Sequence, residues 1–514
     1  MRNLLILFMF PYLLALTACD PPSTINDKKP NVVLILADDL GWSDIGCYGS
    51  EISTPNIDAL ASEGVRFRQA YNTAKCFPSR ATLLTGLYAQ QCGYGETHIH
   101  PIKNAITLGE MFQMAGYRTY WSGKHHGVEN PVTRGFDHYY GLKDGACNFF
   151  NPGHQRPGEG KPARKRDDRA WCIDSVIYRP YTPEDEDFYT TDYFTNYALK
   201  WLDEHQQYDQ PFFLYLAYTA PHDPLMAWPE DIEKYQGKYL IGYEKIRQAR
   251  FGKQKKLGLI DDTYRLSEPW HTAWDSLTAQ EKDEEDLKMA VYAAMIDRMD
   301  QNIGRVMQKL KEMGVEDNTM VIFASDNGAS AEVVNIEGSG EIGSLTRWTS
   351  LGGNWANVGN TPLRLFKNYS REGGIRSPLV VKWPNGNFKN NTFSDHPMHF
   401  IDFMPTFVEV AGTEYPEEYN NEKIIPMQGT SFLPALQGKE VKRSKPLFWH
   451  WRNGSAVRDT DWKLVSWKGE WALFNLKDDP AETNNLIETY PDKADELKNM
   501  YHTWYKRVSD VCSN

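Results

Sequence analysis

Cys76 and Arg80 are the residues of this 514-residue chain whose types and spacing point most directly to chemistry. They belong to residues 76–86, which read Cys-Phe-Pro-Ser-Arg-Ala-Thr-Leu-Leu-Thr-Gly. Proline favours the first helical turn, so a helix predicted over residues 79–88 places the thiol at a helix N-terminus, where backbone N–H groups attract anions. Such a position lowers a thiol pKa, and Arg80, one turn later, can bind a sulfate or phosphate in a fork. For a lone cysteine, the alternative is a buried structural residue.

Acidic and amide side chains follow two apolar runs of the sequence. Asp38 and Asp39 come directly after residues 32–37, and Asp326 and Asn327 follow residues 320–324. Three carboxylates and one amide oxygen form a hard, all-oxygen ligand set that suits Ca²⁺ better than Mg²⁺. Acidic turns at strand ends are common, so the pattern alone only suggests a metal site.

Two further apolar runs are also followed by ionisable groups. Residues 117–121 precede Lys124, His125 and His126, and residues 212–217 precede His222. Continuous apolar strands indicate a parallel sheet whose two faces are covered by helices. Because ligands of such sheets bind beyond the carboxyl ends of the strands, the four runs predict one shared site.

These motifs resemble those of the type I sulfatases, whose defining segment runs Cys-x-Pro-Ser-Arg, four residues, Leu or Thr, and Gly. The resemblance extends from about Pro30 to Leu486. It implies an α/β fold of the alkaline-phosphatase-like superfamily: a large, mixed, mostly parallel sheet sandwiched by helices, plus a small C-terminal antiparallel-sheet subdomain. In that family a formylglycine-generating maturation enzyme oxidises the motif cysteine, here Cys76, to formylglycine (3-oxoalanine).

The resemblance also implies a metal centre. Asp38, Asp39, Asp326 and Asn327 correspond to the family's ligands for one Ca²⁺ ion, and Mg²⁺ is the less favoured alternative. The oxygen of the modified residue 76 is expected near the same ion, so Cys76 belongs to the predicted metal site.

Three more family motifs supply basic groups. Residues 123–127 are similar to the family's Gly-Lys-Trp-His-Leu-Gly, with Lys124 and His126 in matching positions and His125 where Trp is usual, as a second choice. His222 lies in a Pro-His-x-Pro segment, and Lys367 stands five residues before Glu372, where the family has a second sulfate-binding lysine. The catalytic set implied by the resemblance is Cys76, Arg80, Lys124, His126, His222 and Lys367.

The implied mechanism begins with attack of the hydrated aldehyde on sulfur. Arg80, Lys124, His222 and Lys367 bind the sulfate and stabilise its shifting charge, together with the metal. His222, with Lys367, protonates the departing alcohol, and His126 takes the proton of the second hydroxyl, which expels sulfate and restores the aldehyde.

The chain is too long for one simple core, and its segments suggest four parts. These are a signal peptide over residues 1–19, a tether over residues 20–30, a catalytic domain over residues 31–430 and a C-terminal subdomain over residues 431–514. The last part contains four short predicted strands between residues 446 and 474 and a helix over residues 493–508. Further helices are predicted over residues 108–115 and 286–313.

The first residues predict export. Arg2 precedes an apolar run over residues 4–16 that ends in Leu-Thr-Ala-Cys, which resembles a bacterial lipobox with Cys19 as the lipidated residue. The expected product is an exported, membrane-anchored bacterial lipoprotein, periplasmic or at the cell surface; the alternative is an ordinary signal peptide cut near Ala18. Among the other cysteines, Cys147 and Cys172 flank a loop that a disulfide could close.

Charge and composition bear on the substrate. A net charge of −12 argues against nucleic-acid binding. The expected substrate is a sulfated carbohydrate, such as algal polysaccharide or glycosaminoglycan fragments, or an aryl sulfate, with Trp348 and Trp355 as candidate sugar platforms. Two alternatives are a phosphate or phosphonate monoester hydrolase of the same superfamily and an inactive glycan-binding lipoprotein.

Overall fold

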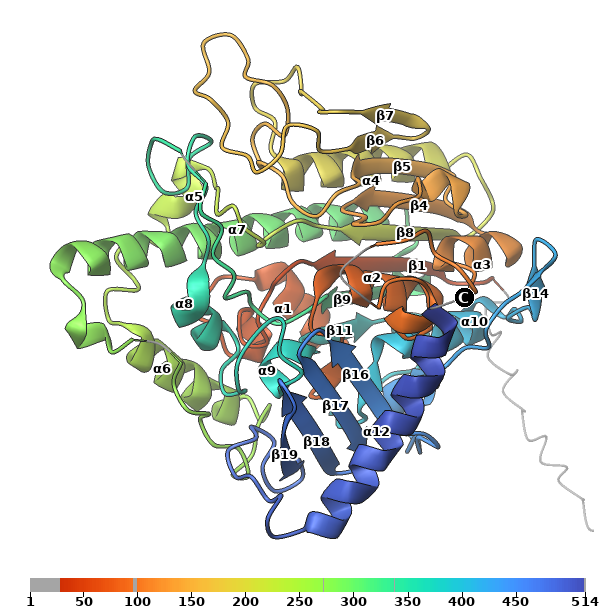
Figure 1. Ribbon diagram of the computed structural model, residues 1–514. Coiled ribbons are helices and arrows are strands. Elements are labelled where there is room, and N and C mark those ends of the chain that lie inside the picture. The colour runs from red at the N-terminus through yellow and green to blue at the C-terminus, as the bar shows by residue number, and fades with distance from the viewer. Residues whose placement is uncertain (1–27, 96–98, 271, 337, 513–514) are drawn as a thin grey trace, which may run out of the picture.

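A ten-stranded sheet forms the centre of the molecule in the computed structural model, which describes residues 28–95, 99–270, 272–336 and 338–512 (Figure 1). The strand order is β12-β2-β11-β9-β1-β8-β4-β5-β6-β7. The bounds are β1 (Asn31–Ala37), β2 (Val65–Phe67), β4 (Arg118–Gly123), β5 (His138–Leu142), β6 (Trp171–Ile173), β7 (Val176–Tyr178), β8 (Phe212–Ala217), β9 (Thr319–Ser325), β11 (Leu379–Lys382) and β12 (Thr392–Ser394).

The middle of this sheet is parallel and contains all four strands that the sequence predicted. β1 lies between β8 and β9, with Leu34 in register with Tyr215 and Ile322. β4 and β5 continue the parallel part beyond β8. β11 and β6 run antiparallel to their inner neighbours, so the sheet is mixed but mostly parallel, as expected.

Helices cover both faces of the sheet because side chains alternate along each buried strand. Val33 and Ile35 of β1 pack into one core together with α1 (Pro55–Ser62), α4 (Thr190–His205) and α7 (Ala279–Glu312). The intervening residues of β1 pack on the other face against α2 (Cys76–Thr85), α3 (Leu108–Met114) and α10 (Phe403–Ala411). This is the layered α/β architecture of the prediction.

Two predicted helices have different ends. α7 starts seven residues before the predicted residue 286, because the Thr278 hydroxyl accepts a hydrogen bond from the Glu281 N–H and the Glu281 carboxylate accepts one from the Thr278 N–H. α2 starts at Cys76 itself and ends at Thr85, and the following Gly86 has a left-handed φ of 69°. The thiol therefore belongs to the first helical turn.

A second, antiparallel sheet follows near the C-terminus. It consists of β16 (Leu447–Trp451), β17 (Gly454–Asp459), β18 (Trp462–Trp467) and β19 (Glu470–Asn475), each paired with the next. Helix α12 (Pro491–Cys512) runs along this sheet, shown in blue in Figure 1. Its core also contains Tyr71, Tyr88 and Ile375, so the small sheet is packed onto the main part of the chain.

The remaining elements are short. They are β3 (Ala70–Tyr71), β10 (Arg376–Ser377), β13 (Met398–His399), β14 (Glu418–Tyr419), β15 (Glu422–Lys423), α5 (Pro229–Glu233), α6 (Tyr243–Lys256), α8 (Gly352–Gly359), α9 (Glu372–Ile375) and α11 (Leu433–Leu436).

The proposed disulfide between Cys147 and Cys172 is wrong. Both thiols are free and buried, and they lie in different cores: Cys147 packs with the α4 and α7 side of the sheet, and Cys172 with the α2 side. The strands between the two faces keep the sulfur atoms apart.

The predicted signal peptide, Cys19 and most of the tether lie outside the described residues. Among the described residues, no helix combines the length and the apolar composition needed to cross a membrane.

Gly123 ends β4 with a φ of 120°, and a Cβ there would lie 1.9 Å from the Ala217 carbonyl oxygen of β8. We therefore expect Gly123→Ala to destabilise the fold by more than about 1–3 kcal/mol, the usual range for a strained backbone, since a steric clash is added. The control is Gly252→Ala in α6, where nothing lies within 4 Å of the new Cβ. Thermal unfolding at one scan rate should show a lower midpoint for the first variant alone; equal midpoints would contradict this reading of the β4–β8 contact.

Candidate active site

The turns after β1, β4, β8 and β9 lie together at one edge of the sheet. The Asp38 N–H donates to the Ala220 carbonyl at 3.0 Å, and the Asp326 N–H donates to the Ala37 carbonyl at 3.2 Å. The Lys124 N–H likewise donates to the Ala217 carbonyl at 2.7 Å. These backbone bonds hold the polar segments in fixed positions relative to one another.

The predicted metal ligands form one buried cluster. The Asp39 N–H approaches Asp326 Oδ1 at 3.3 Å, and Asn327 Nδ2 donates to Asp39 Oδ1 at 2.6 Å. Asp38, Asp39, Asp326 and Asn327 are all buried. Asp38 Oδ1 and Asn327 Oδ1 receive no hydrogen bond from the described residues, although both atoms are enclosed. Buried acceptors without a donor are costly in a protein interior, and a hard cation bound among them would satisfy both.

Each of the three carboxylates also contacts a cationic side chain. Arg80 Nε lies 2.8 Å from Asp326 Oδ2, Lys367 Nζ lies 2.8 Å from Asp39 Oδ2, and Lys124 Nζ forms an ion pair with Asp38 Oδ2. Burial by itself raises the pKa of Asp38, but the charges of Lys124, His222 and Arg80 outweigh it and hold that pKa well below its ordinary value. Burial, followed by repulsion from Asp38, raises the pKa of Asp326 instead.

Arg80 differs from the expectation of a free fork. Its Nε is paired with Asp326, and its Nη1 donates to the Lys124 carbonyl at 3.0 Å. Nη2, which lies 3.8 Å from Asp38 Oδ1 and has no hydrogen-bond partner among the described residues, is the part of the guanidinium left for an anion. Arg80 therefore ties α2 to the strand-end turns and can give one N–H group to a ligand.

Cys76 is the first residue of α2 and is 2% exposed. The expectation of a lowered thiol pKa is wrong. Burial raises the pKa of Cys76 above its ordinary value, and the charges of Lys124, Lys367 and Lys75 offset only part of this effect. An unmodified Cys76 is thus a poor thiolate nucleophile, in spite of its helix N-terminus.

The structure distinguishes the two adjacent histidines. The His126 ring packs edge-on against Phe77, the neighbour of Cys76, with ring centroids 5.5 Å apart. His125 instead packs on Trp121 and Tyr139 inside the sheet core. Burial lowers the pKa of His126, and Lys124 lowers it further, so the neutral imidazole is favoured. The geometry favours His126, the first choice from the sequence, as the histidine beside residue 76.

His222 lies beside the carboxylates of Asp38 and Asp39. Its Nε2 lies 3.5 Å from Asp39 Oδ2, while its Nδ1 lies 2.6 Å from the Asp223 carbonyl and 3.1 Å from Asp223 Oδ1. Asp223 in turn accepts a 2.6 Å hydrogen bond from Ser350 Oγ. His222 is therefore oriented through Nδ1, and its Nε2 faces the cluster. Three possible ligand atoms lie within 4.8 Å of one another, one each from Asp38, Asp39 and His222.

Two charged residues at this site were missed from the sequence. Glu332 Oε1 lies 2.6 Å from Lys75 Nζ, and its Oε2 lies 2.9 Å from Lys367 Nζ. Burial raises the pKa of Glu332, but Lys367 and Lys75 together hold it far below its ordinary value. Lys75 could have been noticed because it adjoins Cys76. Glu332 belongs to no motif, and only the fold brings it to Lys367.

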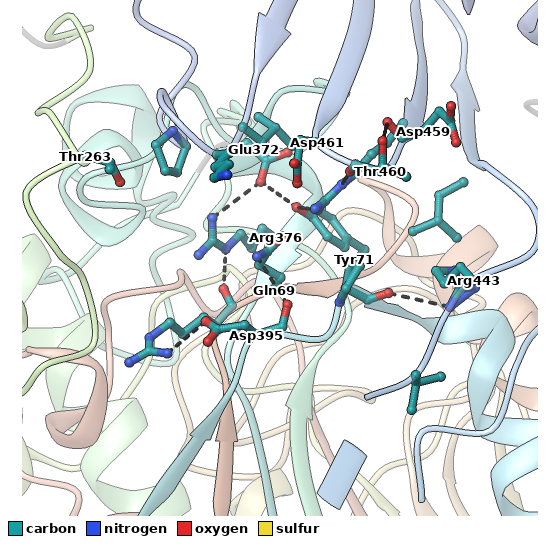
Figure 2. Close-up of a pocket in the computed structure, with 18 of the residues that line it drawn as sticks. Gln69, Tyr71, Thr263, Glu372, Arg376, Asp395, Arg443, Asp459, Thr460 and Asp461 are labelled. Atoms are coloured by element: carbon teal, nitrogen blue, oxygen red, sulfur yellow. Dashed lines mark hydrogen bonds and ion pairs between the residues drawn. The ribbon is translucent and has the colours of Figure 1, made fainter. Parts of the chain in front are cut away.

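A large cavity of the described residues lies elsewhere. It measures about 820 Å³ and lies between the short strands β3 and β10 and the C-terminal sheet (Figure 2). Its polar groups are largely paired with one another: Tyr71 donates to Glu372 at 2.9 Å, and Arg376 donates to the Tyr264 hydroxyl at 2.6 Å. None of the six predicted catalytic residues lines it. A second cavity, of only about 10 Å³, lies beside Asp39, and of the six predicted catalytic residues His222 is the one that lines it.

Comparisons with known proteins agree with this geometry. The sulfatase family matches over residues 30–413, and the C-terminal family of N-sulphoglucosamine sulphohydrolase matches over residues 364–509. An arylsulfatase of Klebsiella aerogenes is 32% identical over 82% of this chain and 95% of its own. An N-acetylglucosamine-6-O-sulfatase of Bacteroides thetaiotaomicron is 26% identical over 97% of this chain and 90% of its own.

A solved structure has the same architecture. Ps i-CgsB, crystallised with k-i-k-neocarrahexaose, superposes with a TM-score of 0.68 at 26% identity and covers 93% of each chain. The family match spans most of the sequence and contains the complete Cys76–Arg80 motif and all four strand-end segments. The chain therefore belongs to the sulfatase family and is a sulfuric ester hydrolase of the alkaline-phosphatase-like fold.

Proposed function

We propose that this enzyme removes sulfate from a sulfated carbohydrate and that residue 76 acts as formylglycine. The observation that carries the proposal is the position of Cys76 at the N-terminus of α2. There it lies close enough to Lys124, Lys367 and Lys75, and to the buried carboxylate of Asp38, to feel their charges. Burial raises the pKa of the thiol, so an unmodified cysteine would be a weak nucleophile here, which is consistent with a modified residue as the reactive group.

Two relatives support a carbohydrate as the alcohol part of the ester. One is named as an N-acetylglucosamine-6-O-sulfatase, and the other was solved with a neocarrahexaose. Both cover at least nine-tenths of this chain. An aryl sulfate would serve as a simpler substrate of the same site.

The reaction is divided among residues that surround position 76. When residue 76 carries the hydrated aldehyde, it supplies the hydroxyl that attacks sulfur. The free Nη2 of Arg80 and the ammonium groups of Lys124 and Lys367 then bind the sulfate oxygens as their charge increases. The ion pairs with Asp38 and Asp39 hold the two ammonium groups in place before substrate arrives.

Two histidines handle the protons in this proposal. His222 is held through Nδ1 by Asp223, so Nε2 is the atom that would give a proton to the departing oxygen. His126 is kept neutral by burial and can accept a proton from residue 76 when sulfate leaves. The two rings are supplied by the segments after β8 and β4.

A single Ca²⁺ ion fits the oxygen cluster, and we propose Asp38, Asp39, Asp326 and Asn327 as its protein ligands. The donor-free oxygens of Asp38 and Asn327 support this choice. Bound there, the cation would polarise the reacting oxygens. We further propose the maturation enzyme that oxidises Cys76 as a partner, and export with lipid attachment at Cys19.

The proposed function predicts hydrolysis of 4-nitrophenyl sulfate in preference to 4-nitrophenyl phosphate. Cys76→Ala should lower sulfate turnover by at least about 1000-fold, a loss usual for removing a covalent nucleophile, while its circular dichroism matches the parent enzyme. A larger kcat/KM for the phosphate ester, or undiminished turnover by the variant, would refute the proposal. Cys172→Ala, which alters another buried free cysteine, serves as the matched control.

Peptide mass spectrometry should find residue 76 as formylglycine in protein made by a host with the maturation enzyme. Lys75 and Arg80 flank the residue, so a protease other than trypsin gives a more useful peptide. Activity should scale with the converted fraction. Full activity in a preparation that contains only cysteine at position 76 would rule out this part of the proposal.

Calcium should stabilise the enzyme after chelator treatment. At a concentration 100-fold above the dissociation constant, linkage gives about 2.7 kcal/mol, visible as a higher unfolding midpoint. Asn327→Ala should reduce the increment because it removes a donor-free oxygen, whereas Asp209→Ala at the surface should keep it. An identical increment in both variants would place calcium elsewhere.

A further inference from the structure

Glu332 borders the small cavity beside Asp39 and His222, and its carboxylate contacts Lys367 of the predicted catalytic set. The cavity of about 10 Å³ is bounded by Asp39, His222 and Glu332, among others, and admits about one water. A sulfate ester can enter only if a bordering side chain moves. The Glu332 side chain is 38% exposed, against 13% for His222 and 3% for Asp39, so it is the charged group there that can turn outward.

Substrate entry changes the partners of Glu332. Its Oε2 shares Lys367 with Asp39, and its Oε1 contacts Lys75 at 2.6 Å and Asn368 Nδ2 at 3.1 Å. A sulfate oxygen that takes Lys367 releases Oε2, while Lys75 still holds Oε1. The released oxygen would then be a charged acceptor for the alcohol part of the sulfate ester. Such an acceptor binds a hydroxyl strongly.

An exposed aromatic ring lies near the chain neighbours of Lys367 and Glu332. Of the sixteen tryptophans, all of which are described, Trp270 is the exposed one, with 54% of its surface accessible. Its ring packs edge-on against Phe366, the neighbour of Lys367, with centroids 5.6 Å apart. A Cβ on Gly353 would lie 3.0 Å from Trp270 Nε1 and 3.7 Å from the Cβ of Ala331, the neighbour of Glu332. Trp348 and Trp355, the platforms suggested by the sequence, are buried.

We propose that Glu332 and Trp270 form the subsite for the alcohol part of the substrate, and that it selects a sugar with a free hydroxyl next to the sulfate ester. The sugar face packs on Trp270, and the hydroxyl donates to Glu332. A second anionic group at that carbon is rejected because it would meet the carboxylate. This inference rests on the proposed sulfatase reaction and adds residues outside the family motifs.

Selectivity tests the role of Glu332. The probes are hexose monosulfates with free neighbouring hydroxyls and the same sugars with a second sulfate on the adjacent carbon. The parent enzyme should prefer the monosulfates, and Glu332→Gln should shift the ratio of kcat/KM values toward the disulfates by roughly tenfold or more, since like-charge contacts cost several kcal/mol. Glu341→Gln, an exposed glutamate nine residues later, is the control and should keep the parent ratio.

Binding tests the role of Trp270 without turnover. In a Cys76→Ala background, Trp270→Ala should weaken binding of the preferred hexose monosulfate by about tenfold, the scale of one aromatic contact. Tyr490→Ala, which removes an exposed aromatic ring (47% accessible) from the chain after β19, should leave the affinity unchanged. Calorimetry gives both values.

The outcomes separate this inference from the sulfatase reaction itself. Unchanged selectivity in Glu332→Gln, or unchanged affinity in Trp270→Ala, would overturn the subsite even if 4-nitrophenyl sulfate is hydrolysed. Absence of any sulfate ester hydrolysis would refute the proposed function, while a Trp270-dependent affinity in the Cys76→Ala background would still identify the sugar subsite.

Discussion

The burial of three carboxylates at one sheet edge is the constraint on which the rest of the site depends. Asp38, Asp39 and Asp326 follow two adjacent parallel strands, so the fold itself forces like charges together. Such a cluster is stable only if cations compensate it. Lys124, Lys367 and Arg80 each pair with one carboxylate, and each comes from a different segment of the chain. The three cations that neutralise these carboxylates therefore also lie where an anionic substrate must bind.

Arg80 connects this electrostatic centre to residue 76. One guanidinium contacts the Asp326 carboxylate and the Lys124 carbonyl, which belong to the segments after β9 and β4. Because Arg80 lies four residues after Cys76, these two bonds also fix the first turn of α2. Because the helical turn between Cys76 and Arg80 is rigid, the contacts of Arg80 also fix the position of residue 76 relative to the carboxylates. A lysine at position 80 could not make both contacts, since it lacks the planar set of donors.

The sequence predicted the parts of the fold that depend on local pattern. The runs that became β1, β8 and β9 are buried on both faces and stand out as mainly apolar segments. β4 reads Arg-Thr-Tyr-Trp-Ser-Gly and is mixed in sequence, although five of its six residues are buried. The same strands deliver the predicted site residues, so their meeting point followed from parallel topology.

The contacts between segments far apart in the sequence were not predictable in this way. The raised pKa of Cys76, the separate cores of Cys147 and Cys172, and the contact of Glu332 with Lys367 all depend on segments far apart in the chain. Trp270 is exposed and Trp355 is buried because different segments pack around them, and the sequence does not show this packing.

The balance of charge also bears on catalysis. In the described structure, Asp38, Asp39, Asp326 and Glu332 are matched by Arg80, Lys124, Lys367 and Lys75, with the histidine His126 held neutral. A divalent cation among the carboxylates would leave the site with excess positive charge. A sulfate ester carries one negative charge, and a second one develops on the departing alcohol oxygen as the ester bond breaks, so the electrostatic match improves during transfer. Groups that bind the developing charge better than the ground state lower the barrier. The outward turn of Glu332 would strengthen this effect, because it removes a competing carboxylate from Lys367 at the moment when sulfate arrives.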